Sequence, residues 1–244
     1  MVGYAGNIRK NILFDKWQHS NKISEVIMQL KQRKINYNKF DDETKEIFLY
    51  EINNHLLMDE KPSEYFNSIL DAPIFRKHPF NVLYNLQTAE QSPVHHPEGN
   101  VWNHTMLVID YAAKEKHKSK NAKSFMWAAL LHDIGKPPTT KVRKGKITSY
   151  DHEKVGADMA REFLLEFTTD EKFIKEVVSL IRWHMQILHV AKDMPFANIT
   201  TMKEETDYNE VALLGYCDRM GRKDPDVKKE EQNIAMFLQK CRSY

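Results

Sequence analysis

The chain has 244 residues, of which 41% are hydrophobic, and a formal net charge of +2. This length allows one large domain, or one domain with an extension, and the hydrophobic content suffices for a packed core. The small net charge excludes a protein that attracts nucleic acid with its whole surface, so any basic attraction must be local.

The sequence shows no feature of a secreted or membrane-bound protein. Its N-terminal residues contain no apolar run typical of a signal peptide, and no window is long and apolar enough to span a bilayer. Two cysteines, Cys217 and Cys241, form neither a disulfide framework nor a metal-binding pair. We expect a soluble cytoplasmic protein with reduced thiols.

The first third of the chain predicts three helices. They begin after Asn21, at Asp41 or Asp42, and at Pro62, and their apolar residues recur at helical spacing. The expected core positions are Ile23, Val26, Ile27 and Leu30, then Ile47, Phe48, Ile52 and Leu56, then Tyr65, Phe66, Ile69 and Leu70. We expect residues 1–78 to form a helical extension and 79–244 the main domain, with one continuous domain as the alternative.

Polar side chains gather in the next segment. Residues 91–100 predict a loop by their Pro, Gly and Asn content, and this loop carries His95, His96 and Glu98. A helix follows from Val101 and places His104 on the same inward stripe as Val108. A single histidine on such a stripe is more often a hydrogen-bonded core residue than a ligand.

The segment 125–138 predicts a buried helix with a polar end. Its apolar run stops at His132-Asp133, where Gly135 is expected to adopt a positive φ and Pro137-Pro138 cannot extend the helix. With no arginine expected nearby, burial of this carboxylate needs a neutralising cation. A hydrogen-bonded polar pair at a helix end is the alternative.

Residues 139–150 predict a short exposed β-hairpin, or a long loop, that turns at Lys144-Gly145. Positive charge is concentrated here beside the His-Asp pair, on Lys136, Lys141, Arg143, Lys144 and Lys146. Such a run is often only a solvated face. Its position makes a phosphate-attracting rim an equal alternative.

Three more helices complete the chain. One opens at His152, one follows Thr169 or Asp170, and one runs from Asp207 to Gly221. The expected inward positions are Val155, Met159, Phe163 and Phe167, then Ile174, Val177, Val178, Ile181 and Met185, then Val211, Leu214 and Cys217. His184 and Asp218 fall on these inward stripes as well.

Several polar residues are thus directed at one core. They are His104, His132, Asp133, His152, His184 and Asp218. Buried charged groups are paired or bound to metal, and the one cationic residue expected on these stripes, Arg182, points elsewhere. Mixed His/Asp ligation suits Fe, Mn, Co, Ni or Zn, with Mg as a further option.

The order His104, His132-Asp133, Asp218 resembles the signature of the HD-domain metal-dependent phosphohydrolases, and residues 132–136 read HDIGK. Residues 96–105 and 217–222 are similar to the HD domain attached to bacterial tRNA nucleotidyltransferases (CCA-adding enzymes) and to poly(A)-polymerase-like proteins. This resemblance covers roughly residues 80–225. It implies an all-α helical bundle with a metal site in its core, here with a helical N-terminal extension.

The resemblance also implies roles for individual residues. The metal ligands would be His104, His132, Asp133 and Asp218, with His152 and His184 completing a second ion that Asp133 bridges. Asp133 and Lys136 would be catalytic, and Lys136 would steady the substrate phosphate. Further candidates for binding phosphate or sugar are His96, Arg143, Arg182 and Arg222.

The implied reaction is attack of a metal-bound hydroxide on a phosphomonoester or phosphodiester of a nucleotide, cyclic nucleotide or RNA end. Alternatives are hydrolysis of an alarmone or dinucleoside polyphosphate, or a non-catalytic module that binds metal and nucleotide. The first hundred residues lack the Gly-Ser turn of a nucleotidyltransferase head, so no nucleotide addition is expected. We expect a phosphorylated small molecule, nucleotide or RNA end as partner, and no membrane or stable protein partner.

Overall fold

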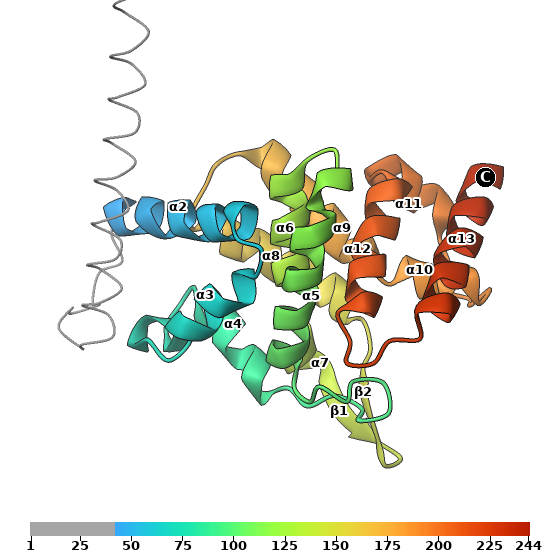
Figure 1. Cartoon of the computed structure of the whole chain (residues 1–244), viewed down its shortest axis with the longest axis horizontal. Helices are drawn as coiled ribbons and strands as arrows, with labels where there is room; N and C mark the ends of the chain where they lie inside the picture. Colours follow the sequence, from blue (N-terminus) through green and yellow to red (C-terminus); the bar gives the residue numbers. More distant parts are fainter. Residues whose placement is uncertain (1–41) are drawn as a thin grey trace, which may run out of the picture.

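The computed structural model describes residues 42–244 as an all-α fold with one small β-hairpin, so the expected fold class is confirmed (Figure 1). The helix expected after Asn21 lies outside the described residues. The helices are α2 (Asp42–Met58), α3 (Pro62–Ile69), α4 (Asn81–Tyr84), α5 (Val101–Glu115), α6 (Ala122–Leu131), α7 (Lys136–Thr139), α8 (His152–Leu165), α9 (Glu171–Trp183), α10 (Gln186–Ala191), α11 (Ile199–Glu205), α12 (Tyr208–Met220) and α13 (Val227–Ser243). The hairpin pairs β1 (Thr140–Arg143) with β2 (Lys146–Ser149).

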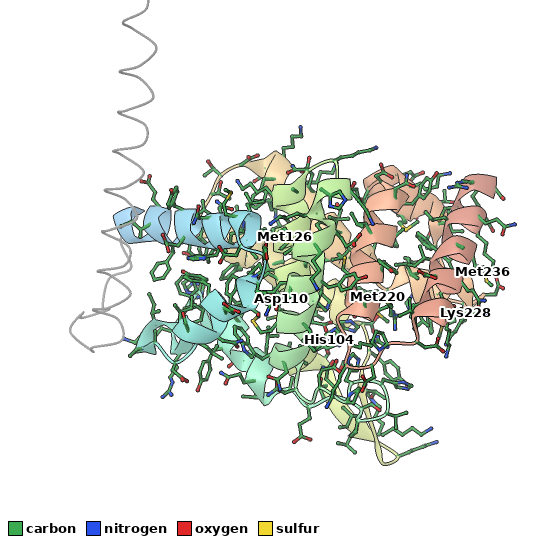
Figure 2. The ribbon with its side chains drawn as sticks, viewed as in Figure 1. His104, Asp110, Met126, Met220, Lys228 and Met236 are labelled. Carbon is green, nitrogen blue, oxygen red and sulfur yellow. The ribbon has the colours of Figure 1, made fainter. Side chains whose placement is uncertain are left out.

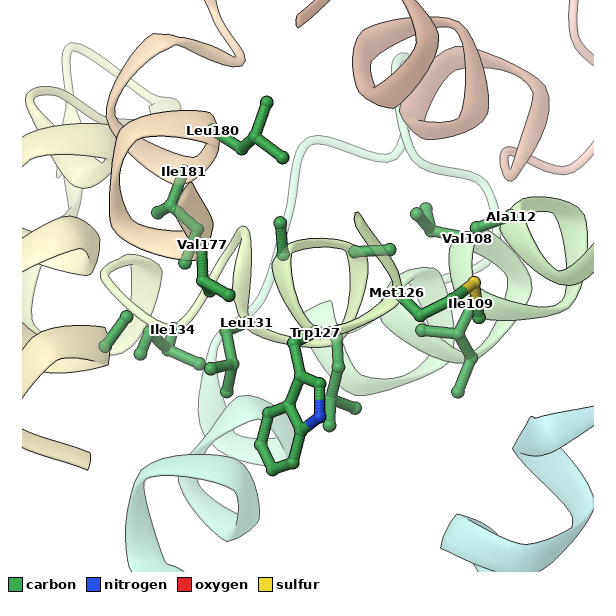
Figure 3. Packing of buried hydrophobic residues seen from close by; sticks show 14 of the residues in the cluster. Val108, Ile109, Ala112, Met126, Trp127, Leu131, Ile134, Val177, Leu180 and Ile181 are labelled. Atoms are coloured by element: carbon green, nitrogen blue, oxygen red, sulfur yellow. The ribbon is translucent and has the colours of Figure 1, made fainter. Parts of the chain in front are cut away.

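Helix α6 lies at the centre of the bundle. Its N-cap Asn121 accepts a hydrogen bond from the backbone N–H of Ser124, and every residue from Ser124 to Leu131 is buried. A helix that is apolar on all sides must be covered on all sides, and α6 packs against α2, α5, α9 and α12. Figure 3 shows Met126 facing Ile109 of α5 and Leu131 near Val177 of α9. This burial fixes the end of α6, where the His-Asp pair begins.

One hydrophobic cluster extends through the described chain. It includes Phe48 of α2 and Phe66 of α3 as well as Phe237 and Cys241 of α13. Apolar residues on both sides of position 78 therefore share a core. The division into an extension and a main domain stays a prediction.

Most expected helix ends are confirmed. Helix α2 begins at Asp42, Asp170 caps α9, and Asp207 caps α12, which ends at Gly221. The inward face expected for α8 is partly wrong, because Val155 and Met159 are only half-buried. Small residues, Gly156, Ala157 and Ala160, form the buried face instead, together with Phe163 and Leu164.

The expectation for Gly135 is wrong in its physical reason. Its φ is −78°, an ordinary right-handed value, and it precedes the short helix α7 rather than closing α6. A Cβ at this position would lie 2.1 Å from the His152 carbonyl oxygen and 2.5 Å from the Gly156 nitrogen. Glycine is required here by the close approach of α8, which brings His152 beside the His-Asp turn.

Both cysteines are buried and unpaired. Over residues 42–244, no helix combines the length and the apolar character that a bilayer-spanning helix needs.

Candidate metal centre

Five segments bring the six expected ligands together. Helix α5 supplies His104, which lies on the half of α5 nearer to the hairpin (Figure 2). The turn after α6 supplies His132 and Asp133. The other three are His152 at the start of α8, His184 at the C-cap of α9 and Asp218 in the last turn of α12. All six side chains are buried.

Asp133 lies at the centre of this cluster. Its Oδ2 is 3.2 Å from Nε2 of His132 and 3.8 Å from Nε2 of His104. Its Oδ1 is 3.4 Å from Nε2 of His152 and 4.0 Å from Nε2 of His184. One carboxylate therefore faces two pairs of imidazoles, one pair with each oxygen.

The cluster divides into two sets of potential ligand atoms, each with all its members within 4.8 Å of one another. The first set is His104, His132 and Asp218. The second is Asp133, His152 and His184.

The hydrogen bonds of the imidazoles fix which nitrogen carries the proton. Nδ1 of His132, His152 and His184 each donates to the carbonyl three residues earlier, at 2.9, 2.8 and 2.7 Å. Nδ1 of His104 donates to Oε1 of Glu98 at 2.9 Å. Because a carbonyl or carboxylate oxygen can only accept, Nε2 of each neutral ring presents a lone pair to the cluster.

These lone pairs meet other electron-rich atoms. Nε2 of His152 lies 3.3 Å from Nε2 of His184, and Nε2 of His104 lies 3.0 Å from Oδ1 of Asp218. Nε2 of His132 and both carboxylate oxygens of Asp133 are buried with no hydrogen bond. Buried polar atoms without partners are costly, and a cation between them would satisfy all of them. The donor set of imidazole nitrogen and carboxylate oxygen fits a divalent transition metal.

The protonation states suit metal ligation. Burial lowers the pKa of His152 to about 4 and that of His184 to about 3, so both rings are neutral near pH 7. Burial alone would raise the pKa of Asp133, but the charges of His132 and Lys136 outweigh it and hold that pKa well below its usual range. The same carboxylate raises the pKa of His132 against the effect of burial, so a metal ion competes with a proton on this ring.

The expectation that no arginine lies near the buried carboxylates is wrong, and Lys136 contacts Asp133 as well. Lys136 Nζ lies 2.6 Å from Oδ2 of Asp133. Arg219 Nε lies 3.7 Å and Arg222 Nη2 4.0 Å from oxygens of Asp218. These residues flank the carboxylates in sequence and fold back onto them at helix ends. The gathering of four imidazoles around Asp133, rather than a lack of cations, therefore supports metal binding.

A cavity of about 350 Å³ opens onto the cluster. Among the predicted substrate-binding residues, His96, Lys136 and Arg222 line it. Arg143 and Arg182 do not, since Arg143 lies over the Tyr150 ring and Arg182 lies over the Trp183 ring. Other lining residues are Gln91, Ser92, Thr148, Ser149, Tyr150 and Arg219.

Two residues that contact the predicted site residues, Glu98 and Gln91, were not predicted from the sequence. Oε1 of Glu98 accepts hydrogen bonds from Nδ1 of His96 and Nδ1 of His104, each at 2.9 Å. Burial would raise the pKa of Glu98, but these two bonds outweigh it and lower the pKa. Gln91 accepts from Lys136 Nζ at 2.7 Å. The signal for Glu98 was its place between two histidines, but a loop has no period that predicts where its side chains point.

Comparison with known proteins identifies the family to which the chain belongs. The family model described as HD domain matches residues 101–222, half of the chain, and this range contains all six clustered residues. The Multifunctional CCA protein of Actinobacillus pleuropneumoniae serotype 5b (strain L20) is 36% identical over 131 residues, 51% of this chain and 30% of that protein. The protein of the same name from Aromatoleum aromaticum (strain DSM 19018 / LMG 30748 / EbN1) is 31% identical over 151 residues, 62% of this chain and 35% of that protein.

The chain thus spans about a third of the length of these relatives. The predicted likeness to the HD domain of CCA-adding enzymes is confirmed. The chain belongs to the HD-domain family and is an enzyme of the metal-dependent phosphohydrolase class.

Proposed function

We propose that the six clustered residues hold one or two divalent transition-metal ions and that the enzyme hydrolyses a phosphate ester at a nucleotide or RNA end. The observation that carries this proposal is the buried cluster of four imidazoles and two carboxylates beside one cavity, in which Nε2 of His132 and both oxygens of Asp133 have no hydrogen bond. In the two-ion form, Asp133 would be shared, because each of its oxygens faces a different pair of histidines. A bound divalent cation supplies Lewis acidity, which lowers the pKa of water and neutralises charge on phosphoryl oxygens.

Cationic side chains of the cavity would bind the phosphate. Arg222 has a buried Nε without a hydrogen-bond partner. Lys136 lies between Gln91 and Asp133, so its ammonium group is already held at the cavity wall. Both groups can donate to phosphoryl oxygens and stabilise negative charge that grows during the reaction.

His96 is suited to a hydroxyl of the sugar. Burial lowers the pKa of His96 to about 4, so the ring is neutral, and its Nδ1 donates to Glu98. Nε2 is then an acceptor on a ring that lines the cavity. A ribose hydroxyl next to the scissile phosphate can donate to this nitrogen.

The size of the cavity favours a small reacting group. A volume of about 350 Å³ is near the lower end of the range typical of small-molecule sites, roughly 300–1,000 Å³. This space suits one phosphate with its sugar. Similarity to Multifunctional CCA proteins supports an RNA end as the source of that phosphate.

Phosphate release by the metal-stripped and reloaded protein tests the proposal. The full chain is treated with EDTA, reloaded separately with Mn, Co, Ni, Zn or Mg, and assayed on 2′-, 3′-, 5′- and 2′,3′-cyclic nucleotide phosphates. We expect phosphate release or ring opening with at least one metal, and none from the Asp133→Asn variant. Asp158→Asn, on the exposed face of α8, is the matched control and should retain wild-type rates. Metal-independent rates, or no turnover of any of these substrates, would contradict the proposal.

A further inference from the structure

The β-hairpin presents a basic face beside the cavity. Its register places Lys141 opposite Thr148 and Arg143 opposite Lys146. Residues directly opposite in an antiparallel pair, and alternate residues along a strand, share one face. Lys141, Arg143, Lys146 and Thr148 therefore lie together, and these four residues with Tyr150 are named the hairpin face.

Side-chain contacts agree with this assignment. The Arg143 guanidinium donates to Oγ1 of Thr148 and lies 4.8 Å from the centroid of the Tyr150 ring. Tyr150 is 65% exposed, an unusual position for a large aromatic side chain. Lys141 and Lys146 are also exposed. A planar aromatic group thus lies among three cationic side chains.

The nearby carboxylates do not neutralise this face. Asp133 pairs with Lys136 at 2.6 Å, and Asp151 pairs with Lys154 at 2.7 Å. Glu153 lies 3.9 Å from Arg182. The positive charge of the hairpin face is therefore available to an external anion.

The hairpin face begins at the cavity and leads away from it. Thr148 and Tyr150 line the cavity, whereas Arg143 and Lys146 are the strand residues on either side of the turn at Lys144-Gly145. In Figure 1 the hairpin projects from the helical bundle. Lys141 and Arg143 are alternate residues of β1, about 7 Å apart along the strand, and Lys146 lies opposite Arg143, so the face presents charge at two levels that suit neighbouring phosphates of an extended strand.

We propose that the hairpin face binds a single strand of nucleic acid whose terminal phosphate lies in the cavity. This inference rests on the proposed function and narrows its substrate class from a free nucleotide to a strand end. Lysine and arginine side chains at successive steps bind backbone phosphates, and an exposed tyrosine can stack on a base. A mononucleotide in the cavity has no second phosphate to place against Arg143 or Lys146.

Binding without turnover tests the inference separately from hydrolysis. A fluorescently labelled hexaribonucleotide with a 3′-terminal phosphate is titrated with the full chain in EDTA, and its anisotropy is followed from low to moderate salt. The test variant is Lys141→Gln/Arg143→Gln/Lys146→Gln. The charge-matched control is Lys172→Gln/Lys175→Gln/Lys192→Gln, three exposed lysines that do not line this cavity.

We expect the hairpin variant to raise Kd about tenfold or more at low salt. The slope of log Kd against log salt should also fall by about 2, since each lost phosphate contact on a single strand removes about 0.7. Tyr150→Leu, which keeps all charges, should raise Kd roughly tenfold through lost stacking, with little change of the salt slope. A second hairpin variant, Lys141→Gln/Lys146→Gln, keeps the Arg143 contacts and should give an intermediate Kd.

Turnover by the metal-loaded enzyme tests the strand site independently of the binding measurement. The ratio of kcat/KM on the hexamer to kcat/KM on the mononucleotide should exceed one for the wild type and the control, and approach one for the hairpin variant. A matching DNA hexamer shows whether the strand must be RNA.

These measurements distinguish the strand site from the proposed hydrolysis. Hairpin-dependent binding of the hexamer without any turnover would uphold the strand site and contradict the proposed hydrolysis. Turnover that is independent of strand length, with equal Kd values for the wild type and the hairpin variant, would overturn the strand site and leave the hydrolysis standing.

Discussion

Glu98 contacts the candidate metal centre from outside the two ligand sets. Its Oε1 accepts from both His96 and His104, and its Oε2 lies 3.4 Å from the backbone nitrogen of Lys223. A carboxylate behind a ligating imidazole orients the ring and increases its basicity. The hydrogen bond from His104 to Glu98 therefore fixes the orientation of the His104 ring.

We expect Glu98→Ala to weaken binding of the ion held by His104 by roughly 10–100-fold. Glu98→Gln should have a smaller effect, because its amide oxygen still accepts hydrogen bonds although the negative charge is lost. Titration of the EDTA-treated protein with Mn²⁺, followed by isothermal calorimetry, measures both effects. Equal Mn²⁺ affinities for the wild type and both variants would show that Glu98 does not support metal binding through His104.

The buried histidines predict how stability depends on pH when metal is absent. Burial lowers the pKa of His152 from its usual 6.5 to about 4. Between these values the unfolded chain binds a proton here that the folded chain does not, so the free energy of unfolding decreases as pH falls from 6.5 to 4. The loss amounts to about 1.4 kcal/mol per pH unit for this residue.

Urea unfolding in EDTA at a series of pH values between 7 and 4 measures this dependence. We expect His152→Gln to flatten the decline, because glutamine does not titrate. A variant that loses stability as steeply as the wild type over this range would contradict the assigned protonation of His152.

At the level of elements, the contact between the His-Asp turn and α8 determines the geometry of the centre. Gly135 and Gly156 approach so closely that the backbone of one turn lies against the backbone of the other. Because Asp133 and His152 are on these two segments, their separation depends on this contact. A single added methyl group must push the segments apart.

We expect Gly135→Ala to lower thermal stability, at a cost of about 1–3 kcal/mol or more, and to weaken metal binding. Gly145→Ala is the control: nothing lies within 4 Å of its added methyl group, and its φ of +74° makes the cost one of local strain. It should leave metal affinity at the wild-type value. Thermal melts and Mn²⁺ titrations of both variants give the comparison, and wild-type affinity in Gly135→Ala would show that this contact does not set the geometry.

Sequence periodicity predicted the elements better than it predicted the contacts between them. The caps at Asp170 and Asp207 and the turn at Lys144-Gly145 follow from local chemistry, which needs no knowledge of the fold. The need for glycine at position 135 could not be predicted in this way, since it arises from a segment 21 residues away in sequence at Gly156.

At the level of the whole molecule, the helical stripes brought the predicted ligands to one core, and the structure places all six together. Lys136 and Arg222 were predicted to bind substrate, but their contacts with Asp133 and Asp218 were not predicted, nor was Arg219, because these residues lie at helix ends, where a side chain's direction depends on tertiary packing. Arg143 does not line the cavity, and its contacts hold it against Thr148 and Tyr150 of the hairpin face, so its predicted role in binding substrate stays a prediction. The ligands at the ends of helices and in the turn after α6 were thus predicted, whereas the contacts of side chains in the 91–100 loop and the hairpin were not.

We expect the protein to hold metal ions between two sets of ligands that share one core. Equilibrium dialysis of the full chain against Mn²⁺ or Co²⁺, followed by elemental analysis, measures the number of ions bound per folded chain. We predict two ions for the wild type and one each for His104→Gln and His184→Gln, which belong to different sets. A folded wild-type protein that binds no metal, or variants that bind as many ions as the wild type, would contradict the account.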